Sequence, residues 1–142
     1  MSASAPPRSY KWGIRIIAAW AVLLALVTLV NLLLLSASAD LYESLGEVWW
    51  IFGLNVLFIT GFGLSAFGLW RQQNWGRQLF LGTMTLWALF NILALLAPQV
   101  IFISERVYQP ENVFYAVLRY GVGLIFTFVY LNLANVKVAF FQ

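Results

Sequence analysis

The stretch IIAAWAVLLALVTLVNLLLLSASA, residues 16–39, decides the fold class of this chain. It carries no charged residue, and it exceeds the roughly 20 residues that an α-helix needs to cross the hydrocarbon core of a bilayer. Three comparable stretches follow at 48–70, 78–104 and 112–136, and only Arg119 interrupts the last of them. Because unpaired backbone N–H and C=O groups are costly in lipid, we expect all four stretches to form membrane-spanning helices.

The composition indicates the same class of protein. The 142 residues are 63% hydrophobic and 9% charged, whereas soluble domains carry roughly 25% charged residues. The chain contains no Cys and no His, which excludes disulfides, thiolate metal sites and the commonest general base. Its net charge of +3 is spread over the helix ends, which favours membrane orientation over nucleic-acid binding. We therefore predict no enzyme activity, no cofactor, no metal and no nucleic-acid partner.

The short polar joints predict an all-α integral membrane four-helix bundle in which sequential helices are antiparallel neighbours. The predicted organisation is a cytoplasmic tail at 1–13, a transmembrane domain at 14–137 with helices at 14–38, 48–70, 78–97 and 113–136, and a tail at 138–142. Residues 36–39 resemble the small-residue site at which a secretory signal is cut. The preceding apolar stretch is longer than the 7–15 residues typical of a signal core, so we expect this helix to be retained.

The basic residues predict the orientation of the helices. Six of them fall on one predicted side of the membrane: Arg8, Lys11, Arg15, Arg71, Arg77 and Lys137. Arg106 and all five acidic residues fall on the other side. Since cationic joints are retained in the cytoplasm, both termini of this multi-pass chain are expected there. The predicted interface anchors agree: Trp12, Trp70, Trp75, Arg71 and Arg77 at the inner boundary, and Trp49 and Trp50 at the outer one.

Four exceptional polar residues lie in the apolar blocks, one from each predicted helix: Asn31, Asn55, Asn91 and Arg119. At 1.5 Å per residue, all four lie about 9 to 10 Å below the outer helix ends and so share one layer. If the guanidinium points inward, the amide oxygens can accept its hydrogen bonds, and an anionic headgroup or a carbonyl-bearing ligand such as a quinone can complete the site. Alternatively, the side chain of Arg119 snorkels outward to the headgroups and the layer is purely structural.

Small residues predict where the helices pack, since close approach drives helix association in lipid. The predicted packing residues form two stripes at matching depth: Ala21 and Ala25 of helix 14–38, with Ala18 and Thr28 on the same face, and Gly61, Ser65 and Gly68 of helix 48–70. We expect these two stripes to face each other.

The inner joint reads Leu69-Trp70-Arg71-Gln72-Gln73-Asn74-Trp75-Gly76-Arg77, and the chain ends with Tyr130-Leu131 followed by Val136-Lys137-Val138-Ala139-Phe140. This pattern resembles a recurring type of small bacterial four-helix membrane protein, in which Ala is more usual at the position of Gly76. The resemblance implies a four-helix fold in a bacterial inner membrane and carries no activity.

Two functions remain open from the sequence. The first is a non-catalytic accessory subunit or assembly factor of a larger membrane complex, because the helices offer surfaces to a membrane-protein partner or a second copy without an intramembrane acid or an activated nucleophile. Its expected surface lies on the last two helices, with four aromatic ridges and three glycine grooves: Trp87, Phe90, Phe126, Tyr130, Gly82, Gly121 and Gly123. The second is a module that binds a small molecule, a quinone or a membrane lipid through the layer around Arg119.

The predicted orientation is testable with single cysteines in this Cys-free chain. Ser44→Cys and Asn112→Cys should react with a membrane-impermeant maleimide in intact cells, because both positions are expected outside. Gln73→Cys should react only after the cells are permeabilised. The unsubstituted chain controls for background, and labelling of position 73 in intact cells would overturn the orientation.

Overall fold

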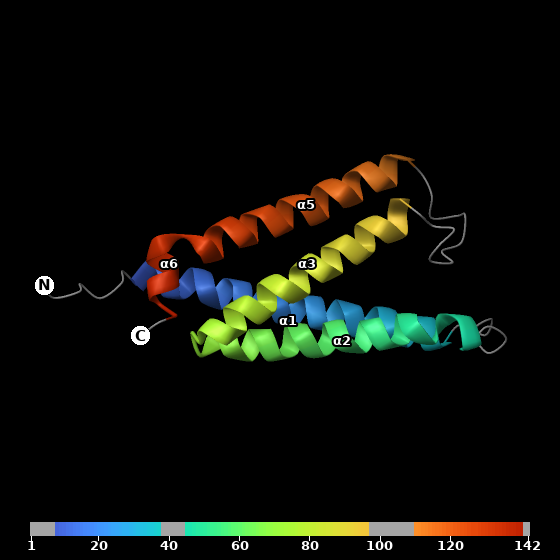
Figure 1. Ribbon diagram of the computed structural model, residues 1–142, viewed down its shortest axis with the longest axis horizontal. Helices are drawn as coiled ribbons and strands as arrows, with labels where there is room; N and C mark the ends of the chain where they lie inside the picture. The colour runs from blue at the N-terminus through green and yellow to red at the C-terminus, as the bar shows by residue number, and fades with distance from the viewer. Residues whose placement is uncertain (1–7, 38–44, 97–109, 141–142) are drawn as a thin grey trace, which may run out of the picture.

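The computed structural model describes residues 8–37, 45–96 and 110–140, and within these ranges the chain is helical apart from short joints and contains no strand. The helices are α1 (Arg8–Ala37), α2 (Leu45–Trp70), α3 (Asn74–Leu96), α5 (Pro110–Asn132) and α6 (Ala134–Val138). Contacts run in chain order, with α1 packed on α2, α2 on α3 and α3 on α5. Figure 1 shows α1 and α2 side by side, while α3 and α5 diverge from them with increasing distance from α6.

Two helices in the described ranges are long and apolar enough to cross a membrane. They cover Tyr10–Leu34 in α1 and Trp49–Trp70 in α2. Residues Tyr120–Asn132 of α5 form a shorter apolar segment. Large apolar side chains such as Leu34 and Phe126 are exposed over 66% and 68% of their surface, which favours apolar surroundings over water.

The turn between α2 and α3 is short because α2 ends in a Schellman motif. The N–H of Gln73 donates to the carbonyl of Gly68 at 2.8 Å, and the N–H of Gln72 donates to the carbonyl of Leu69 at 2.9 Å, which is the hydrogen-bond pair of that motif. Gln72 takes the left-handed conformation the motif needs, with φ at 56°, although a side chain is sterically disfavoured there. This compact turn lets α3 begin at Asn74 rather than at the predicted residue 78.

The hairpin brings the backbones of two glycines into contact. A Cβ atom on Gly68 would lie 2.5 Å from the Cα of Gly76, and a Cβ atom on Gly61 would lie 2.7 Å from the Oγ1 of Thr83. Gly61 and Gly68 therefore face α3, and the prediction that their stripe faces α1 is wrong. The physical reason is the short turn, which forces α2 and α3 to their closest approach where only glycine fits.

The small residues of α1 lie in or against the buried core. Ala18 and Ala21 belong to the buried core, and Ala25 packs against it. Ala18 lines a groove together with Ala66 of α2. Ser65 is fully buried, and its hydroxyl donates to the carbonyl of Phe62 at 2.9 Å, so its own helix satisfies it.

Arg77 lies in the first turns of α3 but reaches the end of α5. Its side chain is 7% exposed, its Nη1 donates to the carbonyl of Leu131 at 3.2 Å, and its Nε donates to the Oδ1 of Asn74 at 3.1 Å. The last carbonyls of a helix lack intrahelical partners and carry partial negative charge, so a cation stabilises them. Arg77 was expected as an interface anchor, and its burial gives it a different role, as a bridge between α3 and α5.

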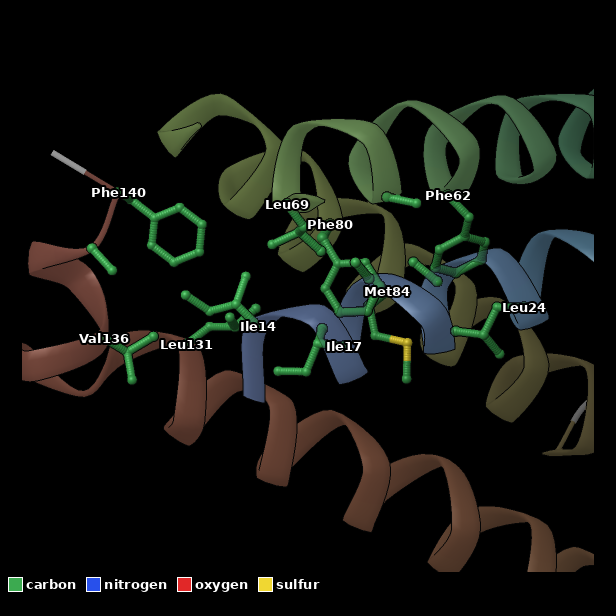
Figure 2. Packing of buried hydrophobic residues seen from close by; sticks show 14 of the residues in the cluster. Ile14, Ile17, Leu24, Phe62, Leu69, Phe80, Met84, Leu131, Val136 and Phe140 are labelled. Atoms are coloured by element: carbon green, nitrogen blue, oxygen red, sulfur yellow. The ribbon is translucent and has the colours of Figure 1, made fainter. Parts of the chain in front are cut away.

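The C-terminal segment folds back onto this bridge. At Leu133, φ is −55° and ψ is 135°, which interrupts the helix predicted to continue to residue 136. The chain then turns through α6, and Val136, Ala139 and Phe140 become buried. Figure 2 shows the side chains of Phe140 and Val136 converging with Leu131 and Ile14. Ala139 and Phe140, expected in the C-terminal tail, are therefore part of the core, whereas Val138 at the end of α6 is exposed.

The start of α1 also differs from the prediction. The helix begins at Arg8 rather than at residue 14. Tyr10 packs against the core, and the hydroxyl of Tyr130 lies against Gly13, in the space that a Cβ atom would occupy. These tertiary contacts order residues that hydropathy alone assigned to a tail.

We predict that Gly76→Ala destabilises the protein by about 1–3 kcal/mol, because the added methyl group meets backbone atoms that cannot move aside. Unfolding of the detergent-solubilised protein by SDS titration, followed by circular dichroism, measures the change. Gly82→Ala is the matched control in the same helix, since a Cβ atom there meets nothing within 4 Å. Equal stability of the two variants would show that the glycine contact is not tight.

Arg77→Gln should destabilise the protein by about 1–3 kcal/mol, because it removes the donor to the buried carbonyl of Leu131. The same SDS titration applies. The control is Arg71→Gln, whose exposed guanidinium stacks 4.4 Å from the ring centroid of Phe67 and should change stability by less than about 1 kcal/mol. If both variants unfold at the same SDS fraction, Arg77 does not bridge the helices.

Candidate ligand-binding site

A cavity of about 190 Å³ lies between the four long helices. It occurs where α3 and α5 diverge from α1 and α2, away from the tightly packed end. The lining side chains are Trp20, Leu23, Leu24, Val27, Thr28 and Asn31 from α1, Asn55 and Phe58 from α2, Trp87, Phe90 and Asn91 from α3, and Tyr120 from α5. We call it the asparagine cavity, because it brings together three asparagines that are far apart in the sequence.

The amides in this cavity are only partly used by the protein. The Nδ2 of Asn55 donates to the carbonyl of Ile51 at 2.8 Å, and the Nδ2 of Asn91 donates to the carbonyl of Trp87 at 2.7 Å. Each of these bonds consumes one N–H and leaves an amide oxygen and a second N–H. Among the described residues, no buried side-chain polar atom lacks a partner. The remaining amide atoms are therefore accessible and available to a ligand.

Aromatic rings form the walls and hold one another in place. The ring centroids of Trp87 and Tyr120 are 5.0 Å apart with planes at 87°, and those of Trp87 and Phe62 are 6.0 Å apart at 81°. The ring of Phe90 lies 6.1 Å from that of Phe58. Edge-to-face and tilted pairs of this kind are the favoured arrangements of aromatic side chains. Aromatic rings in mutual contact thus form a large part of the cavity wall.

The spacing of residues along α1 and along α3 explains this lining. In α1, positions 20, 24, 27, 28 and 31 follow a helical stripe, and Trp87 precedes Asn91 by one helical turn in α3. Sequence reasoning selected the asparagines but did not include Trp20 in their layer, and it assigned Trp87 to the expected partner surface. The spacing to the asparagines is the signal that identifies them as cavity walls. Trp87 and Phe90 also point inward, so they do not form the outer ridges expected for a partner.

The fourth residue of the predicted polar layer is Arg119. Arg119 lies in α5, and its side chain falls outside the described residues. Its neighbour Tyr120 lines the cavity.

The predicted anchors lie at the two ends of the helices. Trp12, Trp49, Trp70 and Trp75 are exposed, and the guanidinium of Arg15 lies over the rings of Trp12 and Trp70 at 5.9 and 5.5 Å. The indole N–H of Trp75 donates to the Oε1 of Gln73 at 2.6 Å. Trp50 differs, because its ring packs edge-on against Phe90 with centroids 6.1 Å apart.

The described cavity residues are all uncharged, which limits the chemistry of this site. They can hydrogen-bond and stack, but they supply no carboxylate or imidazole for proton transfer. No group of His, Cys, Asp or Glu suited to hold a metal ion occurs in the part of the chain that the structure describes. Comparisons of the chain with protein-family models, with curated proteins and with solved structures found no match.

Proposed function

We propose that this chain is a non-catalytic, multi-pass membrane protein that binds a neutral amphiphile in the asparagine cavity. The observation that carries the proposal is the convergence of Asn31, Asn55 and Asn91, from three helices, on one aromatic-walled cavity. Amide groups inside an apolar bundle are costly unless they are hydrogen-bonded. A ligand with its own donors and acceptors relieves that cost.

Several features support the membrane part of the proposal. α1 and α2 contain apolar segments of 25 and 22 residues. The uncharged stretch at 78–104 contributes to α3, and the stretch at 112–136, interrupted only by Arg119, contributes to α5. The basic helix ends support a four-helix bundle with both termini in the cytoplasm. The sequence resemblance favours a bacterial inner membrane.

The cavity dimensions define the class of ligand. A volume of 190 Å³ equals about six water molecules at roughly 30 Å³ each, enough for one ring or one small headgroup. Trp20, Leu23 and Val27 of the lining are exposed, so the apolar remainder of an amphiphile can leave the cavity alongside α1. A ligand carbonyl, such as that of a quinone ring, can accept from an amide N–H, and a ligand hydroxyl can also donate to an amide oxygen.

A second candidate function is that of an accessory subunit or assembly factor. It is favoured by the outer face of α5, where Val122, Ile125 and Phe126 are exposed over more than half of their surface and a Cβ atom on Gly121 meets nothing within 4 Å. Such a face of bulky and small residues suits a transmembrane helix of another protein or of a second copy.

The ligand proposal predicts that Asn91→Leu releases a small molecule that the unsubstituted protein retains. Purification from the native membrane in mild detergent, followed by solvent extraction and mass spectrometry, should find one amphiphile in near-stoichiometric amount. Loss of one buried hydrogen bond of about 1–3 kcal/mol should weaken its binding by roughly five- to more than a hundredfold.

Asn132→Leu is the matched control for this experiment. Its Nδ2 donates to the carbonyl of Phe128 at 2.9 Å, as Asn91 does within its own helix, but Asn132 does not line the cavity. This variant should retain the molecule. Equal retention by Asn91→Leu and Asn132→Leu contradicts the ligand site, and a stoichiometric companion protein in light scattering would instead favour the subunit function.

A further inference from the structure

A second concave surface, a groove, lies between α1 and α2 toward the α2–α3 turn. This groove has a volume of about 510 Å³ and is lined by Ala18, Ala19, Val22, Gly63, Ala66, Phe67 and Trp70. All of its lining residues are apolar or glycine, and it shares none of them with the asparagine cavity. Its lining on α2 extends over roughly 10 Å of helix, from Gly63 to Trp70 at 1.5 Å per residue.

Two arginines stand on the rings that line one end of this groove. The guanidinium of Arg15 lies 5.5 Å from the ring centroid of Trp70, and the guanidinium of Arg71 lies 4.4 Å from that of Phe67. Each cation therefore lies over a ring of the groove lining, in the part of α2 that precedes the α2–α3 turn. Stacking on an aromatic face holds a guanidinium in place while leaving its N–H groups free to bind an anion.

Within the described ranges of α1 and α2, the one acidic position lies far from these cations. The acid of α2, Glu47, precedes Arg71 by 24 positions, which is roughly 36 Å along the helix axis. At the end that carries Arg15, the described part of α1 adds a further basic residue, Lys11, one helical turn earlier.

We propose that this groove binds an anionic phospholipid, with one acyl chain lying along the small residues of α1 and α2 and the phosphate held by Arg15 and Arg71. The charge complementarity selects this occupant, because an apolar helix of a partner or a second copy would fill the groove without meeting the cations. The inference depends on the proposed membrane location. It concerns a different ligand and a different surface from the asparagine cavity.

The acyl-chain part is tested by filling the groove. A Cβ atom on Gly63 meets nothing within 4 Å, so Gly63→Leu places a side chain in the groove without a clash inside the protein. Gly53→Leu is the control in the same helix, because Gly53 is equally open and lies outside the groove.

The headgroup part is tested by neutralising the cations singly, as Arg15→Gln and Arg71→Gln. Lys11→Gln is the matched control, since Lys11 is exposed and lies one helical turn before Arg15. A basic residue near an anionic lipid surface contributes about 1 kcal/mol, so each arginine variant should lower phosphatidylglycerol binding about fivefold.

The measurement is native mass spectrometry of the full chain released from micelles that contain equal amounts of phosphatidylglycerol and phosphatidylcholine. The unsubstituted protein, Gly53→Leu and Lys11→Gln should retain one phosphatidylglycerol in preference to phosphatidylcholine. Gly63→Leu should lose it, and the two arginine variants should retain about five times less.

Three results would overturn the proposal. They are retention of phosphatidylglycerol by Gly63→Leu, an equal loss in Lys11→Gln and Arg15→Gln, which would indicate diffuse attraction, and dissociation of a companion protein or second copy by Gly63→Leu. Alkaline carbonate extraction of the native membrane tests the proposed membrane location separately from the lipid-binding groove. Release of the chain would refute the membrane location and both ligands with it, whereas an embedded chain without lipid preference refutes the groove alone.

Discussion

The buried guanidinium of Arg77 is the interaction on which the rest of the structure depends. A charge with so little exposure needs partners, and the end of α5 provides a carbonyl at 3.2 Å together with the negative end of the helix dipole. The contact of Gly68 with Gly76 sets where Arg77 lies. Phe140 completes the arrangement, with its ring 5.8 Å from the guanidinium, so one charged side chain connects α3, α5 and the C-terminal segment.

The helices pack tightly at the end of the molecule near α6 and separate toward the opposite end. The core residues nearest to α6, such as Ile14, Leu131 and Val136, are fully buried, whereas α3 and α5 diverge from α1 and α2 farther away (Figure 1). The divergence leaves room for the asparagine cavity. The protein thus separates two kinds of surface: neutral amides and rings between the diverging helices, and cations beside an apolar groove near the α2–α3 turn.

Particular residues show how far sequence reasoning reached in the site. Asn31, Asn55 and Asn91 were grouped from helix rise alone, and all three line one cavity, because a regular 1.5 Å rise converts sequence position into depth. Depth does not specify rotation about the helix axis relative to neighbours. For that reason the aromatic walls were missed, and Gly61 and Gly68 were assigned to α1 although they face α3.

By itself, the sequence determined the helical class and the apolar segments of α1 and α2, because both follow from runs of uncharged residues and from the cost of unpaired backbone groups in an apolar medium. Only the tertiary structure decided which faces meet, where the last helix breaks, and that Arg77 is buried. Leu133 and Arg77 show the reason. Arg77 is buried through a hydrogen bond to Leu131, 54 positions away, and the helix break at Leu133 precedes residues that are buried against the core; local composition carries no record of such contacts.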